Sequence, residues 1–112
     1  MSINSDAADI LESAAFVIGT GHHAKNYVAV NARKKECETF SDNACAWCAL
    51  GAIEAASDAL VTDYNARHLA KGALYLAIGS NSIALWNDAP ERTPAEVEAA
   101  MLKAAAKLRG EA

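Results

Sequence analysis

The sequence predicts one mainly α-helical (α+β) domain spanning residues 1–112. We expect about four helices plus a short one, with a small two-stranded β-hairpin between the first and second helices. The length of 112 residues fits one domain and is too short for two ordinary ones. Hydrophobic residues make up 53% of the chain, and alanine, the best helix former, supplies much of that fraction. Several segments have apolar residues at helical spacing, and one short segment is β-prone.

The first helix is predicted to begin near Ser5 or Asp6, because either side chain can cap free backbone N–H groups. Apolar residues then recur at helical spacing from Ala7 to Ile18. Residues 19–21, Gly-Thr-Gly, predict the end of this helix, since glycine tolerates the left-handed conformation common at helix termini.

The β-hairpin is predicted from two short segments that follow the first helix. Residues 27–31, Tyr-Val-Ala-Val-Asn, are typical of a strand, and residues 37–40, Cys-Glu-Thr-Phe, are the expected partner. The charged residues 33–36 would form the turn. Because an isolated hairpin is marginally stable in water, we expect it to pack on the helices.

The second helix is predicted from about Ala44 to Leu60, with Asp42 or Asn43 as its cap. Trp47 would lie near its start, where it could cover the hairpin. Because its inner face holds only small residues, another helix can approach its backbone closely. That face is formed by Cys45, Cys48, Ala49, Ala52, Ala56 and Ala59.

Local start and stop signals predict the remaining helices. Residues 62–63, Thr-Asp, begin a helix that Gly79 ends near residue 78. Residues 80–82, Ser-Asn-Ser, can cap a short helix through residues 83–86. The clearest signal is residues 93–96, Thr-Pro-Ala-Glu, a capping box with proline at the first helical position.

Charge and composition restrict the location and the partners. The formal net charge of −4 argues against a nonspecific nucleic-acid binder, and it also disfavours a helix-turn-helix around residues 60–62. The sequence shows neither a signal-peptide pattern nor an apolar stretch approaching the ~20 residues that span a bilayer. Three cysteines do not suggest a secreted disulfide framework. We therefore expect a cytoplasmic protein with reduced thiols and no membrane or nucleic-acid partner.

Three segments stand out by their order and spacing: residues 44–53, ACAWCALGAI, residues 83–88, IALWND, and residues 92–97, RTPAEV. Together they resemble a family of small proteins from bacteria and their phages, classed as a domain of unknown function. The resemblance covers roughly residues 5–108 and implies a fold rather than an activity. Residues 21–26, Gly-His-His-Ala-Lys-Asn, depart from the Trp-Gln-Gly stretch usual in that family, so a role tied to that stretch does not carry over.

Cys45 and Cys48 form a Cys-x-x-Cys pair at the expected helix start, where the helix dipole can lower the pKa of a thiol. The α/β sheet usual around a redox pair is not predicted, so two small buried side chains are the favoured interpretation. A catalytic cysteine would need a histidine within hydrogen-bond reach. If the protein is an enzyme, the candidate residues are Cys48, Cys45, His22 and His23.

A zinc site is a second hypothesis for the cysteines, because three cysteines and one histidine suit tetrahedral Zn²⁺. No second Cys-x-x-Cys and no paired histidine motif supports it, so no cofactor is predicted. The candidate ligands are Cys37, Cys45, Cys48 and His68, with His22 or His23 as alternatives to His68.

Trp86, Asn87, Asp88 and Arg92 are the candidate binding residues, since this segment reads as polar and exposed. A structural role is the favoured interpretation. Trp86 would fill the core, while Asn87 and Asp88 would hydrogen-bond the backbone where the chain turns. Arg92 would pair with Asp88 or Glu96 in a surface ion pair of small energetic worth.

The predicted function is macromolecular binding by a small phage- or prophage-type accessory protein, with another protein as the expected partner. No convergent catalytic set is predicted, so an enzyme is disfavoured. Since small phage proteins often occlude a host machine, an inhibitor of a bacterial defence system, such as an anti-CRISPR protein, is a specific hypothesis within this class. The alternative is a cysteine-dependent enzyme or a small zinc-binding protein using Cys45 and Cys48. The alanine-rich helix faces would also permit a homodimer.

Overall fold

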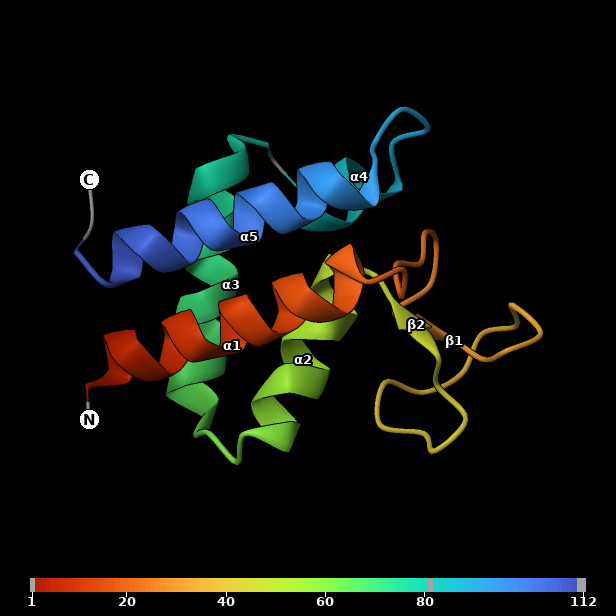
Figure 1. Ribbon diagram of the computed structural model, residues 1–112, viewed down its shortest axis with the longest axis horizontal. Coiled ribbons are helices and arrows are strands. Elements are labelled where there is room, and N and C mark those ends of the chain that lie inside the picture. The colour runs from red at the N-terminus through yellow and green to blue at the C-terminus, as the bar shows by residue number, and fades with distance from the viewer. Residues whose placement is uncertain (1, 81, 111–112) are drawn as a thin grey trace.

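A computed structural model describes residues 2–80 and 82–110 of the chain, and Figure 1 shows its arrangement. Over these residues it has a mainly helical fold with a two-stranded antiparallel sheet between the first and second helices. The predicted fold class is therefore confirmed. The elements in chain order are α1 (Ile3–Gly19), β1 (Ala29–Val30), β2 (Ala46–Trp47), α2 (Ala49–Ala59), α3 (Tyr64–Ile78), α4 (Ile83–Asp88) and α5 (Pro94–Leu108).

The helices form the body of the molecule, and the sheet with its loops lies at one end of it (Figure 1). α1 and α5 run side by side in opposite directions and share the most extensive helix–helix contact. α3 crosses behind both of them. The radius of gyration of 12.9 Å is close to the ~13 Å expected for a compact chain of this length. No helix among the described residues is long and apolar enough to cross a membrane.

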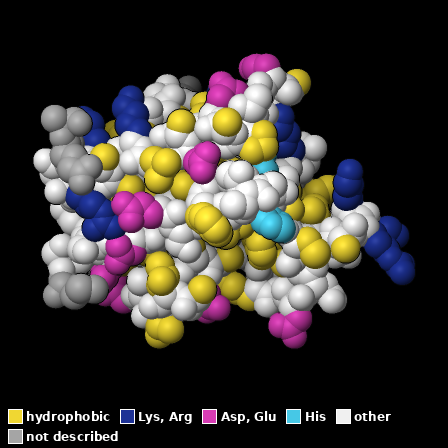
Figure 2. Space-filling view, in the orientation of Figure 1, with side chains coloured by type: hydrophobic (Ala, Val, Ile, Leu, Met, Phe, Trp, Pro, Cys, Tyr) yellow, Lys and Arg dark blue, Asp and Glu magenta, His cyan; other side chains and the backbone are white. Residues whose placement is uncertain are grey.

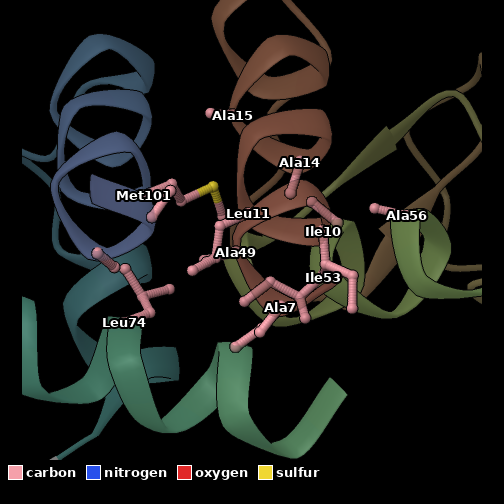
Figure 3. Packing of buried hydrophobic residues seen from close by; sticks show 14 of the residues in the cluster. Ala7, Ile10, Leu11, Ala14, Ala15, Ala49, Ile53, Ala56, Leu74 and Met101 are labelled. Carbon is pink, nitrogen blue, oxygen red and sulfur yellow. The ribbon is translucent and has the colours of Figure 1, made fainter. Parts of the chain in front are cut away.

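The core lies between α1, α2, α3 and α5, where a few large side chains fill the space between alanines. In Figure 3 the Met101 side chain of α5 extends toward Leu11 of α1, and Ile10 lies close to Ile53 of α2. Leu74 comes from α3. The alanines let the helix backbones approach closely, as the composition predicts. The fully buried large side chains are Ile10, Leu11, Ile18, Ile53, Leu74, Met101 and Val97, with the polar Asn87 and Ser57.

Capping residues set the bounds of the later helices as predicted. Asp63 accepts a hydrogen bond from the Ala66 N–H at 2.8 Å and begins α3, and Gly79 ends it with a φ of 64°. Thr93 and Glu96 form the predicted capping box of α5. Ser82 caps α4, which runs two residues further than expected; Asn81, part of the predicted cap, lies outside the described residues.

The first helix ends as predicted but begins earlier than expected. It starts at Ile3, because the Ser2 hydroxyl accepts the Ser5 N–H at 3.0 Å and serves as the cap. Ser5 and Asp6, the expected caps, both lie in its first turn. An acidic residue there is favourable, since its charge opposes the positive end of the helix dipole.

The expected strand partner of residues 27–31 is only partly confirmed, because residues 37–40 form no strand. β1 pairs with β2 instead, with Ala29 opposite Trp47 and Val30 opposite Ala46. On the other edge of β1, the Cys37 N–H donates to the Ala29 carbonyl at 3.1 Å, and Val30 lies opposite Glu36 in an isolated antiparallel bridge. The local hairpin therefore forms only in part, and the long-range pairing with β2 is added on the opposite edge of β1.

The same pairing corrects the start of the second helix. α2 begins at Ala49 with Cys48 as its cap, and not near Ala44 with Asp42 or Asn43. Residues 45–48 are extended because the N–H groups of Cys45 and Cys48 donate to carbonyls of residues 30 and 28. Of the predicted small-residue face, Cys45 precedes the helix and Ala59 is exposed, while Cys48, Ala49, Ala52 and Ala56 are buried.

Candidate functional site

Asn87 is fully buried near the end of α4, and its side-chain amide makes four hydrogen bonds. The Oδ1 atom accepts the backbone N–H of Ala49 at 3.0 Å and a hydrogen bond from His23 Nε2 at 2.7 Å. The Nδ2 group donates to the Ala24 carbonyl at 3.0 Å and to Asp88 Oδ1 at 2.9 Å. Since a backbone N–H can only donate and a carbonyl can only accept, these partners fix the orientation of the amide. They also require a proton on His23 Nε2.

Asn87 and the residues beside it hold one loop, residues 22–26, against the end of α4. The backbone N–H of Asn26 donates to Asp88 Oδ1 at 2.8 Å. The Lys25 ammonium donates to the Ala89 carbonyl at 2.7 Å, so its charge lies at the negative end of the α4 dipole. We call residues 22–26 the clamped loop. Sequence reasoning expected Asn87 and Asp88 to bond the backbone of their own turn, but their partners are 38 to 63 residues away.

Trp86 and Arg92 complete this corner of the fold. The Arg92 guanidinium lies 4.2 Å from the centroid of the Trp86 ring, within the range of a cation–π interaction. Arg92 Nε donates to the Trp86 carbonyl at 3.0 Å, and Nη1 pairs with Glu96 at 3.3 Å. The structure thus brings the four predicted binding residues together, and each of them contacts other parts of the chain.

Cys48 and Cys45 occupy different environments although only two residues separate them. Cys48 is 6% exposed, and its Sγ accepts the Gly51 N–H at 3.3 Å as the cap of α2. Burial raises the pKa of the Cys48 thiol, against the lowering effect of the backbone N–H groups of Gly51 and Leu50. Cys45 is exposed, and its thiol donates to the Asn43 carbonyl at 3.5 Å. A raised pKa is the opposite of what a nucleophilic cysteine needs.

The histidines of the hypothetical catalytic and zinc sites bond other groups than the thiols. His22 Nδ1 donates to the backbone carbonyl of Cys45 at 2.8 Å, and His23 bonds Asn87. His68 lies on α3 with its ring edge-on to that of Tyr64 at 4.2 Å. Across residues 2–80 and 82–110, no three His, Cys, Asp or Glu side chains lie close enough to hold a metal ion. The predicted set of Cys37, Cys45, Cys48 and His68 is therefore not brought together.

A cleft of about 560 Å³ lies between the clamped loop and the sheet. Its charged and aromatic lining residues are His22, His23, Lys25, Tyr27 and Lys34, and none of its lining residues is acidic. Figure 2 shows histidine side chains near the end of the molecule where lysine and arginine side chains project. Residues 30–32 and 45–46 also line the cleft.

A second hollow of about 620 Å³, the α3–α5 groove, lies at a different place on the surface. Most of its lining is apolar, and Leu76 is 79% exposed although it is a large hydrophobic side chain. The charged residues of the lining are Lys103 and Lys107, both on α5. The lining consists of Leu69, Gly72, Ala73, Tyr75, Leu76, Ala77, Lys103, Ala104, Lys107 and Leu108.

The sequence profile of a family of unknown function, DUF6197, matches residues 3–107. The chain belongs to this family. The match confirms membership in a family of unknown function, and the DUF6197 region reaches from the first residue of α1 into the last turn of α5. No curated protein and no solved structure matches the chain. The description of DUF6197 states no activity, so the clamped loop, the cleft and the groove are interpreted from their own chemistry.

Sequence reasoning missed both hollows, although each left a signal. Tyr75 and Leu76 are two adjacent large apolar residues, and both are exposed on α3. Basic residues also gather at positions 33–35, within a chain of net negative charge. Neither signal shows which element forms the other side of the groove or of the cleft, because that depends on how α3 packs on α5 and β1 on β2.

Proposed function

We propose that this protein acts by binding another protein, and that the partner places an acidic amphipathic helix in the α3–α5 groove. The observation that carries the proposal is the exposed Leu76 beside Lys103 and Lys107 in an otherwise apolar hollow. Exposed apolar surface of this kind, edged by polar groups, often marks a site of protein–protein contact. A groove between two helices is suited to the apolar face of a third helix.

The charge of the groove selects the chemistry of the partner. The chain as a whole carries a net charge of −4, yet both charged side chains that line the groove are lysines. An acidic helix would be repelled by most of the surface and attracted at this hollow. Complementary charge of this sort favours correct orientation and faster association more than raw affinity. The apolar contacts of Tyr75 and Leu76 would then supply most of the binding free energy.

A narrower proposal concerns the class of partner. The resemblance to small proteins of bacteria and their phages supports a phage-type accessory protein that occludes a component of a bacterial defence system, as an anti-CRISPR protein does. This narrower proposal rests on analogy with small phage proteins and on no structural observation beyond the groove. Plating of phage on a host with an active defence system would test it: the protein should restore plaques, and the Leu76→Asp variant should not.

The binding step itself can be measured with designed peptides. The probe is a labelled helical peptide with leucines along one face and glutamates beside them, compared with the same peptide carrying lysines in place of the glutamates. We expect tighter binding of the acidic peptide, and a loss of about tenfold or more on Leu76→Asp, since burying a leucine is worth about 1.5–3 kcal/mol. Lys103→Glu together with Lys107→Glu should invert the preference between the peptides.

Leu85→Asp is the matched control, because Leu85 is 75% exposed on α4 and does not line the groove. Equal loss of binding in the Leu76 and Leu85 variants, or equal affinity for the two peptides, would overturn the proposal. So would sedimentation showing that the chain forms a dimer that Leu76→Asp dissociates, because a second copy would then occupy the groove.

A further inference from the structure

Positive charge is concentrated in one segment of the chain. Residues 22–35 contain Lys25, Arg33, Lys34 and Lys35 and no acidic residue. The other 98 residues contain six basic and fourteen acidic side chains. Glu36 follows this segment but does not line the cleft. An acidic protein thus carries a local region of positive potential, which attracts anions.

This segment forms much of the lining of the cleft beside the clamped loop, and it is held in place from several directions. The Trp47 N–H donates to the His22 carbonyl, and the Ala24 N–H donates to the Trp47 carbonyl, both at 2.9 Å. The Asn87 side chain hydrogen-bonds both Ala24 and His23, as described above. A wall fixed in this way loses little entropy when a ligand binds, so the cleft is preorganised.

Three side chains in the cleft remain available to a ligand. Lys34 is exposed and takes part in none of the ion pairs formed among the described residues. The Nδ1 atom of His22 is occupied by the Cys45 carbonyl, which leaves Nε2 as the ring nitrogen for a ligand. Tyr27 is half exposed and offers an aromatic face.

We propose that this cleft binds a small phosphorylated molecule with an aromatic ring, of mononucleotide size. Lys34 and the doubly protonated His22 ring, through its Nε2–H, would donate to the phosphate, and Tyr27 would stack on the aromatic ring of the ligand. The volume of about 560 Å³ falls within the range usual for small-molecule sites. A long polyanion fits less well, because beyond the cleft it would meet the acidic remainder of the surface. This site is separate from the α3–α5 groove, so either proposal can fail without the other.

The experiment is a titration of the ¹⁵N-labelled protein, followed by amide chemical shifts, with AMP, adenosine and inorganic pyrophosphate as separate probes. We expect AMP to give saturable shifts confined to residues 21–34 and 45–46. Adenosine and pyrophosphate should each bind more weakly, because each lacks one of the two groups that the cleft recognises. Lys34→Gln should weaken AMP binding about tenfold, since a charge-assisted contact is removed. Tyr27→Leu should reduce AMP binding to the level of pyrophosphate.

Lys103→Gln is the matched control, because it removes one lysine from the α3–α5 groove and leaves the cleft unchanged. Its AMP affinity should equal that of the unmodified chain, and melting temperatures should show that all variants fold. The proposal is overturned if no phosphate probe gives saturable shifts, if Lys103→Gln weakens binding as much as Lys34→Gln, or if adenosine binds as well as AMP. Tighter binding of a single-stranded oligonucleotide than of AMP would also overturn it, since the ligand would then be a nucleic acid.

Discussion

The side-chain carbonyl of Asn87 accepts the backbone N–H of Ala49 at 3.0 Å, and this contact joins the end of α4 to the first residue of α2. The first N–H groups of a helix have no partner within the helix. Cys48, the residue just before the helix, accepts the Gly51 N–H, whereas Asn87 on a distant element accepts the Ala49 N–H. The cap of α2 is therefore assembled from two places in the sequence.

Replacing Asn87 by alanine should lower the free energy of unfolding by about 3 kcal/mol, because it leaves the Ala49 N–H and the Ala24 carbonyl buried without partners. Asn87→Asp should also destabilise, since a carboxylate cannot donate to that carbonyl. Chemical denaturation followed by circular dichroism measures both. Leu85→Ala on the same short helix should change stability by less than about 0.5 kcal/mol. Equal effects at the two positions would contradict the role assigned to the amide.

Gly51 and Gly72 are both helical glycines, yet alanine should have opposite effects at the two positions. A Cβ at Gly51 would collide with the Val28 carbonyl oxygen, so Gly51→Ala should cost about 1–3 kcal/mol despite its better helix propensity. A Cβ at Gly72 meets no atom within 4 Å, so Gly72→Ala should stabilise by about 0.5–1 kcal/mol. Thermal melting compares the pair. Stabilisation by Gly51→Ala would show that α2 does not approach the Val28 carbonyl this closely.

Val61 is 89% exposed and has a φ of 54°, in the left-handed region that β-branched residues avoid. It follows Leu60, the C-cap of α2. The Val61 N–H donates to the Asp58 carbonyl and the Thr62 N–H to the Ser57 carbonyl, which is the bonding of a helix end that usually holds glycine. Val61→Gly should therefore stabilise the protein by about 1 kcal/mol, since it relieves strain and removes no buried contact. Leu60→Gly is the control at a φ of −85° and should destabilise. A loss of stability in both variants would refute the argument from strain.

The three thiols should react with iodoacetamide at neutral pH in the order of their exposure: Cys45 first, Cys37 next and Cys48 last. Burial both blocks Cys48 and raises its pKa, so two effects slow its reaction. Mass spectrometry of peptides from timed samples gives the three rates. Fastest labelling at Cys48 would show an activated thiol and would favour the alternative of a cysteine-dependent enzyme.

Those elements whose signals are local could be predicted from the sequence. The start of α5 follows from Thr93 and Glu96, and the end of α3 from Gly79, because these residues act within one helical turn. The start of α2 could not be predicted this way. Residues 45–48 have small or apolar side chains compatible with a helix, and hydrogen bonds to the distant carbonyls of residues 22, 28 and 30 hold them extended.

The candidate site was predictable only in part, for the same reason. The segment from Trp86 to Arg92 holds the predicted binding residues, but the hydrogen-bond partners of Asn87 and Asp88 lie far away in sequence. His23 and Ala24 bond Asn87 only because the clamped loop returns to α4. No residue pattern near Asn87 predicts that arrangement. The cleft and the groove could not be predicted either, because they depend on how separate elements pack.

The close packing of α1 against α5 has a consequence for biosynthesis. The ribosome releases α1 first, and Met101 and Val97, which cover part of its apolar face, emerge some 80 residues later. During that interval Ile10 and Leu11 lack part of their native contacts, and the nascent chain exposes an apolar surface that can aggregate. Completion of the fold must therefore await residues 94–108, and a chain stalled before them would be a natural client for chaperones.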